Sequence, residues 1–163
     1  VARAKASADL VVAFPHWGRN YSKVKGTQKR IAKRLVAAGA DVIIGHHGHA
    51  AQAFGHTEGV PTMWGLGNLF FGTPGRFGHD KMQPGYGLLA RMVLKDGAID
   101  RFELVPIMLN NRLVEFQPRL CTVEESRKVL GELAQLGGAE VVFDGGVGIF
   151  RAEAPDHPGR STR

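Results

Sequence analysis

Three histidines lie within four residues, at positions 46, 47 and 49, directly after a short apolar run. Neutral imidazole is the commonest metal ligand in proteins, and two rings separated by one small residue can reach the same side of a turn. The triplet His47-Gly48-His49 therefore predicts metal ligation. A histidine-rich loop that binds nothing, or that takes up metal only adventitiously, is the alternative, because short motifs give many false positives.

A further histidine, His16, also follows an apolar run. The segments 10–14 and 42–44 are short and rich in β-branched or apolar residues, which predicts two buried strands. The segment 27–38 between them predicts a helix with Thr27 as its N-cap, with Ile31 and Leu35 on the buried face. A strand–helix–strand unit is almost always parallel and right-handed, so if the two strands are neighbours, His16 and the later histidines should emerge at one edge of one sheet.

A third strand is predicted at 60–64, and the turn that follows it contains Asn68. The side chain of Asn68 could reach the histidine pocket, or the residue could serve only to tolerate a left-handed turn; both interpretations stay open. The segment 70–87 is rich in Gly and Pro and predicts a loop near the site, with His79 and Asp80 in solvent.

The second half of the chain shows patterns of structural elements and no candidate site residues. Asp96-Gly97 between the apolar runs 88–94 and 99–105 is a strong β-hairpin signal. Thr122 and Glu125 have capping-box spacing, which predicts a helix ending at Gly137. Its expected inward residues are Val129, Leu130, Leu133 and Leu136. A short strand is predicted at 141–143.

Composition bounds the class of protein. The 163 residues are 44% hydrophobic and 22% charged, as in a globular domain, and no apolar run approaches the roughly 20 residues that span a bilayer. Cys121 is the only cysteine, which excludes an internal disulfide and a cysteine-based zinc cluster. Any metal must therefore be held by His, Asp, Glu or Asn.

The net charge of +6 comes largely from basic residues between positions 19 and 34. Most of them fall on the solvated face of the predicted helix, and no aromatic residues are interleaved to stack on bases, so nucleic-acid binding is not expected. A positive rim of this kind could attract an anionic substrate, such as a phosphate ester or a polycarboxylate.

A resemblance to a known family rests on several linked motifs. They are Phe14-Pro15-His16-Trp17-Gly18, the helix with Gln28 and Ala32, the stretch from Ala38 to His49, and Gly65-Leu66-Gly67-Asn68-Leu69-Phe70. In this order they resemble the later part of the CapA family of bacterial poly-γ-glutamate capsule biosynthesis proteins, within the calcineurin-like metallophosphatase superfamily. The resemblance implies an α/β fold, a partial metallophosphatase-type α/β/β/α sandwich with a β-hairpin.

The resemblance also implies the site. His16 and His47 correspond to ligands of one metal, and His49 to a ligand of a second. The metals expected in the full-length protein are two divalent ions of manganese, zinc or iron. His46 is the additional histidine of the CapA pattern and is expected to contact substrate or supply a proton, as the catalytic residue. Substrate contacts are expected from Trp17, Arg19 and Asn68.

One departure from the superfamily pattern matters. Its members carry an aspartate-bearing strand, a Gly-Asp pair and an Asn-His pair in front of the position of His16, and no stretch here supplies them. We therefore expect the chain to be the carboxyl-terminal portion of a longer protein. It would carry half of a site and be inactive alone, and its unpaired sheet edge predicts self-association.

The expected organisation has three parts. Residues 1–120 would form the metallophosphatase-like portion, residues 121–150 a helix and strand that pack on it or form a small appendage, and residues 151–163 a flexible tail. The function implied by the resemblance is a metal-dependent, hydrolase-like component of capsule synthesis, export or turnover. It would work with the capsule synthesis machinery on an anionic polymer or phosphate-type substrate. The expected location is the cell envelope, either membrane-associated or extracellular. The alternative is a catalytically inactive scaffold domain of an exopolymer assembly.

Overall fold

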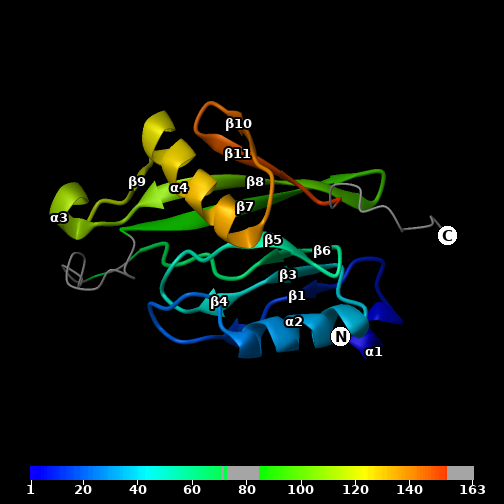
Figure 1. Cartoon of the computed structure of the whole chain (residues 1–163). Coiled ribbons are helices and arrows are strands. Elements are labelled where there is room, and N and C mark those ends of the chain that lie inside the picture. Colours follow the sequence, from blue (N-terminus) through cyan, green and yellow to red (C-terminus); the bar gives the residue numbers. More distant parts are fainter. Residues whose placement is uncertain (71, 73–84, 154–163) are drawn as a thin grey trace.

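The computed structural model describes residues 1–70, 72 and 85–153, and its first half is a sheet of four strands with one helix on it (Figure 1). The order in this sheet is β1-β3-β6-β5, in which β1, β3 and β6 are parallel and β5 is antiparallel to β6. The elements are β1 Val12–Ala13, α2 Gly26–Ala37, β3 Val42–Ile44, β5 Phe54–Thr57 and β6 Val60–Met63, after a short helix α1 Ala2–Lys5. The predicted parallel strand–helix–strand unit is confirmed.

The second sheet is antiparallel and is built around one long hairpin. Its order is β10-β11-β8-β7, with β9 paired to the other end of β8. The elements are β7 Tyr86–Lys95, β8 Ala98–Met108, α3 Asn111–Val114, β9 Arg119–Leu120, α4 Val123–Gly137, β10 Val142–Asp144 and β11 Val147–Arg151. Asp96 and Gly97 both have positive φ in the β7–β8 turn, so the hairpin predicted there is confirmed, as is the α/β class.

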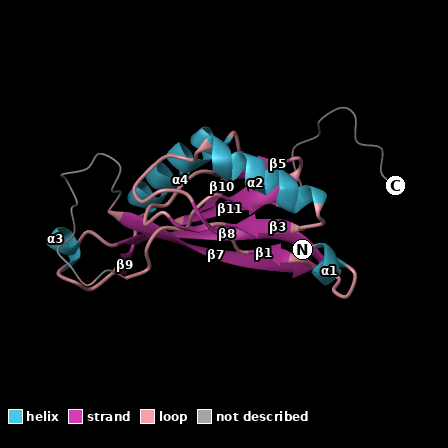
Figure 2. Ribbon diagram, turned by 90° about the horizontal axis from the view of Figure 1, so that it is seen from below, coloured by secondary structure: helices cyan, strands magenta, loops and turns pink. Residues whose placement is uncertain are grey.

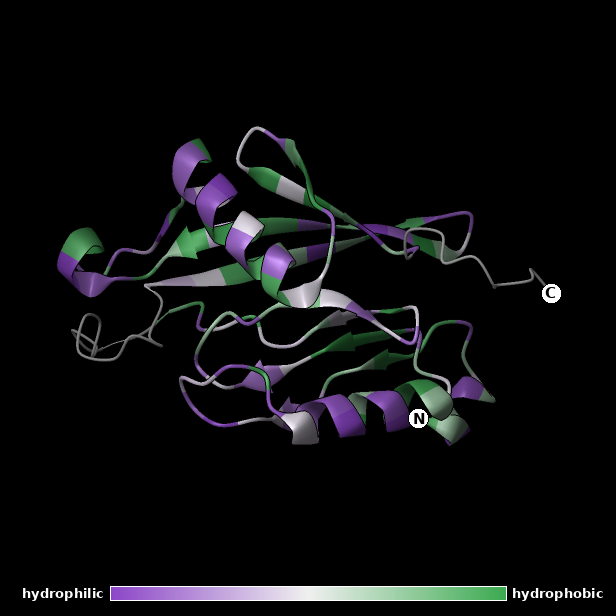
Figure 3. Cartoon of the chain, in the orientation of Figure 1, coloured by the Kyte–Doolittle hydropathy of each residue, from purple (hydrophilic) through white to green (hydrophobic). Residues whose placement is uncertain are grey.

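Two apolar clusters bury the two faces of the first sheet. Ile43 packs with Ala32 of α2 on one face, whereas its neighbour Val42 packs with Phe102 of β8 and Leu130 of α4 on the other. Neighbouring residues of a strand point to opposite faces, so β3 is apolar throughout because both of its faces are covered. Figure 3 shows these apolar strands lying between α2 and the second sheet, and Figure 2 shows α2 and α4 on the same side of the molecule.

Both longer helices differ in detail from expectation. α2 begins at Gly26, with Lys25 rather than Thr27 as its N-cap, and the side chain of Gln28 accepts a hydrogen bond from the Lys25 backbone N–H at 2.9 Å. The buried face is shifted by one residue, because Ala32 is fully buried while Ile31 is 41% exposed. The inward position predicted for Leu136 of α4 is also wrong: it is 65% exposed, although the predicted capping box at Thr122 is present.

Sequence patterns missed several strands, namely β5, β9, β11 and the two-residue strands at His16–Trp17 and His46–His47. β5 lies where a loop was expected, and β11 was not predicted. β1 is the edge of its sheet among the described residues, with Phe14 beyond it 59% exposed; the self-association expected from such an edge stays a prediction. His79 and Asp80 lie outside the described residues. None of the described helices has the length and apolar character needed to cross a membrane.

Candidate metal centre

Two very short strands bring the histidines together beyond the ends of β1 and β3. β2 (His16–Trp17) pairs in parallel with β4 (His46–His47), and His16 lies opposite His46 in the register. The ring centroid of His16 lies 4.8 Å from that of His46 and 4.2 Å from that of His47. The predicted meeting of the two histidine groups at one sheet edge, where α2 begins, is therefore observed (Figure 1).

His49 completes the cluster and is held by a side chain from a distant loop. Its ring centroid lies 6.3 Å from that of His47, and its Nδ1 lies 2.8 Å from Oδ1 of Asn68. Histidines that bind metal through one ring nitrogen usually donate the other to an oxygen, which fixes the tautomer and the ring orientation. Asn68 occupies that supporting position, so its placement favours orienting His49 over the substrate contact expected from the sequence.

The backbone at the cluster is strained. His47 has φ of +96° and His49 has φ of +54°, conformations that L-residues other than glycine rarely adopt and that cost on the order of 1–3 kcal/mol each. The Tyr21 backbone N–H donates to the carbonyl of Gly48 at 2.7 Å and holds this turn from the neighbouring loop. Strain that the surroundings maintain is typical of functional sites.

Electrostatics favour the neutral form of the central ring. Desolvation lowers the pKa of His47 below that of an ordinary histidine, and the positive charges that His16, His49 and His46 can carry lower it further. The neutral imidazole is the form that binds a metal ion. The cluster thus prepares His47 for ligation by placing like charges around it.

Trp17 anchors the cluster from inside the protein. It is 7% exposed, its Nε1 donates to the Trp64 carbonyl at 2.9 Å, and the two indoles stack with centroids 5.7 Å apart. Gly45 is required beside it, because a Cβ there would lie 2.3 Å from both Trp17 Nε1 and the Trp64 carbonyl oxygen. This burial favours a structural role for Trp17 over the predicted substrate contact. Arg19 is exposed next to the cluster, where it could still meet a ligand.

Two buried glutamines support the loops, and the sequence analysis assigned them no role in the site. Gln28 of α2 donates through Nε2 to Oε1 of Gln52 at 3.1 Å, and Gln52 donates to the Ser22 carbonyl at 2.7 Å. The chain of bonds ties the helix to both histidine-bearing loops. Tyr21, with its ring 5.7 Å from that of His49, was also missed. No local pattern marks these residues, because their partners are distant in sequence.

His46 faces a different neighbour from the other histidines. Its ring stacks on Phe14 with centroids 4.4 Å apart, at the exposed edge of the cluster. The catalytic role expected for His46 stays a prediction.

The histidine side chains of the cluster are of the kind that binds metal, but they supply only part of a metal site. Within the described ranges, no group of three or more His, Cys, Asp or Glu side chains is arranged to hold one ion. Two ions close together also need a bridging anion to offset their repulsion, and the neighbours that shift the pKa of His47 are histidines rather than carboxylates.

Comparisons with known proteins identify relatives of this region. Residues 1–73, which include all four clustered histidines and Asn68, match the family described as bacterial capsule synthesis protein PGA_cap. The capsule biosynthesis protein CapA of Bacillus anthracis is 45% identical over 69 residues, which cover 41% of this chain and 16% of the relative. The PGA biosynthesis protein CapA of Bacillus subtilis is 32% identical over 108 residues, covering 66% and 27%.

A more distant similarity extends further along the chain. A probable polyglutamine synthesis accessory protein of Mycobacterium tuberculosis is 25% identical over 142 residues, which cover 85% of this chain and 37% of the relative. The chain thus spans between about a sixth and somewhat more than a third of the length of these relatives.

Proposed function

The chain belongs to the CapA family of bacterial poly-γ-glutamate capsule biosynthesis proteins, and from this premise we propose that its histidine cluster is the metal-binding part of a hydrolase-like component of capsule synthesis, export or turnover. The observation that carries the proposal is the convergence of His16, His47 and His49 at one sheet edge, with His49 oriented by Asn68. Those three imidazoles would hold divalent metal, as manganese, zinc or iron.

The residues of the chain would have distinct tasks in such a site. His47, kept neutral by its surroundings, and His16 would bind one ion, and His49 would bind another while Asn68 holds its second nitrogen. A bound divalent metal would supply Lewis-acid activation of a phosphoryl or amide centre and a hydroxide nucleophile near neutral pH. His46, at the exposed edge of the cluster, would exchange a proton with the substrate. Arg19 would attract its negative charge.

Metal binding tests this proposal directly. We expect Co²⁺ or Zn²⁺ to bind the chain, measured by cobalt absorbance and by calorimetry, and His47→Ala to weaken binding at least about tenfold because one ligand is lost. The matched control is His56→Ala on β5, whose ring nitrogen contacts the Ala152 carbonyl 3.1 Å away, outside the cluster. Equal binding by the wild type and His47→Ala would refute the assignment of these ligands.

A scaffold role is the second candidate function. It is favoured by one observation, that the described residues bring no three-ligand group and no bridging carboxylate to the cluster. In that case the histidines would belong to the fold without holding a metal, and the chain would act in an exopolymer assembly through binding rather than catalysis. Absence of metal binding by the wild-type chain, with normal folding, would favour this alternative.

A further inference from the structure

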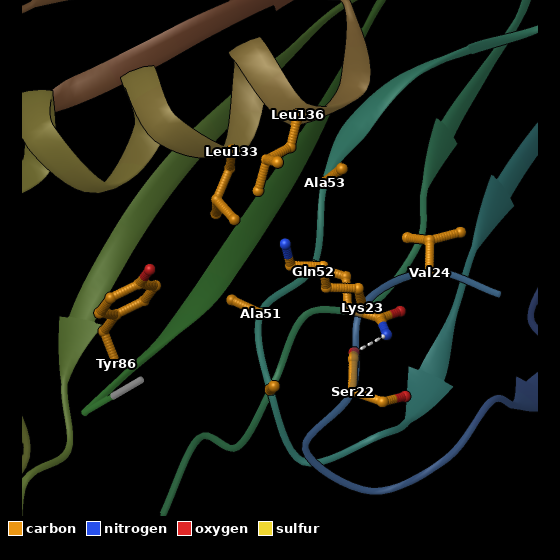
Figure 4. A pocket seen from close by; sticks show the side chains of 10 residues that line it. Ser22, Lys23, Val24, Ala51, Gln52, Ala53, Tyr86, Leu133 and Leu136 are labelled. Atoms are coloured by element: carbon orange, nitrogen blue, oxygen red, sulfur yellow. Dashed lines mark hydrogen bonds between the residues drawn. The ribbon is translucent and has the colours of Figure 1, made fainter. Parts of the chain in front are cut away.

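A groove runs between α2 and α4, outside the histidine cluster. It consists of two cavities, of about 310 and about 260 Å³, which meet at Val24, Ala53 and Leu136 because these residues line both. Figure 4 shows the larger cavity, with Leu133 and Leu136 pointing into it from α4. Neither cavity is lined by His16, His46, His47 or His49.

The helix α4 supplies an apolar wall that the core does not use. Leu136 is 65% exposed at the last turn of the helix, although its neighbours Leu133 and Ala134 are buried. α4 comes close to β5 here because both elements have a glycine at the contact. A Cβ on Gly137 of α4 would lie 1.8 Å from the Phe54 carbonyl oxygen. The exposed leucine is therefore held firmly in place, and its apolar surface faces the groove.

The opposite wall is cationic. Lys23 lines the larger cavity, and Lys29 and Lys33 of α2 line the smaller one. Lys33 pairs with Glu58 at 2.7 Å, while Lys23 and Lys29 form no ion pair among the described residues. Glu58 is the one carboxylate among the residues that line the two cavities, and its pairing with Lys33 leaves the charges of Lys23 and Lys29 unbalanced in the groove. The groove therefore favours a ligand that carries negative charge.

One end of the groove lies beside the histidines. Ser22 and Ala50 line the larger cavity and directly follow Tyr21 and His49, whose rings are 5.7 Å apart. Gln52, which also lines it, fixes both loops through its bond to the Ser22 carbonyl, drawn in Figure 4. A chain lying in the groove would thus be led toward the cluster.

We propose that this groove binds an anionic peptide chain in which carboxylates alternate with short methylene segments. γ-Linked glutamate has this chemistry, with one carboxylate and two backbone methylenes in each repeat. The carboxylates would contact Lys23 and Lys29, and the methylenes would lie on Val24 and Leu136. The inference rests on the proposed function, because it assigns the groove as the track that delivers the polymer to the histidine site.

Other polyanions fit the groove less well. A membrane surface is flat, and an interfacial helix presents several large apolar residues to it, whereas α2 exposes only Ile31 in that class. Single-stranded nucleic acid is bound by stacking on aromatic rings. Three aromatic rings line the two cavities, and none of them is exposed: Tyr86 is half-buried, His56 is half-buried against Phe150, and Trp64 is 8% exposed and stacked on Trp17.

Binding of a fluorescein-labelled poly-γ-glutamate oligomer to the chain, followed by anisotropy, tests the proposal. The double variant Lys23→Glu with Lys29→Glu should bind roughly tenfold more weakly or worse. The matched control, Lys95→Glu with Arg112→Glu, makes the same change in net charge at exposed positions outside the groove and should bind within about twofold of wild type. Equal weakening in both double variants would overturn the proposal, since binding would then depend only on net charge.

Two further measurements separate this inference from the metal site. Leu136→Ser should weaken polymer binding without unfolding the chain, because that side chain is exposed; unchanged binding would overturn the apolar contact. His47→Ala should leave oligomer binding intact while it removes metal, so the two proposals can fail independently. Tighter binding of a single-stranded oligonucleotide, or of phosphatidylserine vesicles, than of the glutamyl oligomer would overturn the proposed ligand.

Discussion

The two strands that carry His16, His46 and His47 have two residues each, whereas β7 and β8 of the second sheet have 10 and 11. The histidine edge has non-glycine residues at positive φ and partly exposed rings. The second sheet has instead a long antiparallel ladder, with fully buried aromatic side chains such as Phe102 and a helix with a complete capping box.

This difference separates the source of stability from the place of function. Burial of large apolar side chains is the main favourable term in folding, and most of those residues lie between the two sheets and α4. The histidine edge contributes strain and like-charge proximity, which destabilise a fold. The hairpin and α4 therefore provide the stability that allows the histidine edge to hold an unfavourable geometry.

The largest effect expected from this comparison is on the second sheet. Phe102→Ala removes a fully buried ring and should lower the free energy of unfolding by about 3–5 kcal/mol, measured by urea denaturation. Leu89→Ala on the neighbouring strand is the control; that side chain is 43% exposed and should cost about 1 kcal/mol or less. Similar losses in the two variants would contradict the view that the buried face of this sheet carries the stability.

An intermediate effect is expected where the histidine edge meets its own core. Gly45→Ala would place a Cβ 2.3 Å from Trp17 Nε1, so the hydrogen bond between the two tryptophans should break at a cost of about 1–3 kcal/mol. Gly131→Ala in α4 is the control, because nothing lies within 4 Å of its added Cβ and alanine favours a helix by about 1 kcal/mol. The two variants should shift the urea midpoint in opposite directions; a neutral Gly45→Ala would show that the edge is loosely packed.

The smallest effect concerns acid sensitivity of the scaffold. Hydrogen bonds from Arg119 and from the Thr122 backbone lower the pKa of Glu125 from 4.5 to about 2. Because the folded pKa lies below the unfolded one, this stabilisation is present above pH 4.5 and is lost as the pH falls toward 2. Glu125→Gln should cost about 1 kcal/mol or less at pH 7 and flatten the decline of stability over that window.

Thermal unfolding at a series of pH values measures this change. Glu124→Gln alters the adjacent exposed residue of the same helical turn and should keep the wild-type decline. If the stability of Glu125→Gln declined with falling pH as steeply as that of the wild type, the cap would not set the acid sensitivity of this region.

Much of the site could be predicted from the sequence because its geometry is local to a strand–helix–strand unit. Parallel strands joined by one helix end at the same sheet edge, so the meeting of His16 with His46 and His47 follows from chain direction alone. The Asp96-Gly97 turn and the Thr122 cap are likewise set by residues within a few positions of one another.

The tertiary structure alone decided the supporting contacts. Trp17 bonds to Trp64, Gln28 to Gln52, and Asn68 to His49, each pair joining segments 19 to 47 positions apart. Local patterns record which residues a strand or helix prefers, but they do not record which side chain a folded neighbour brings into contact. The groove between α2 and α4 exists for the same reason, since its two walls come from helices that are distant in sequence and lie near each other only in the packed fold.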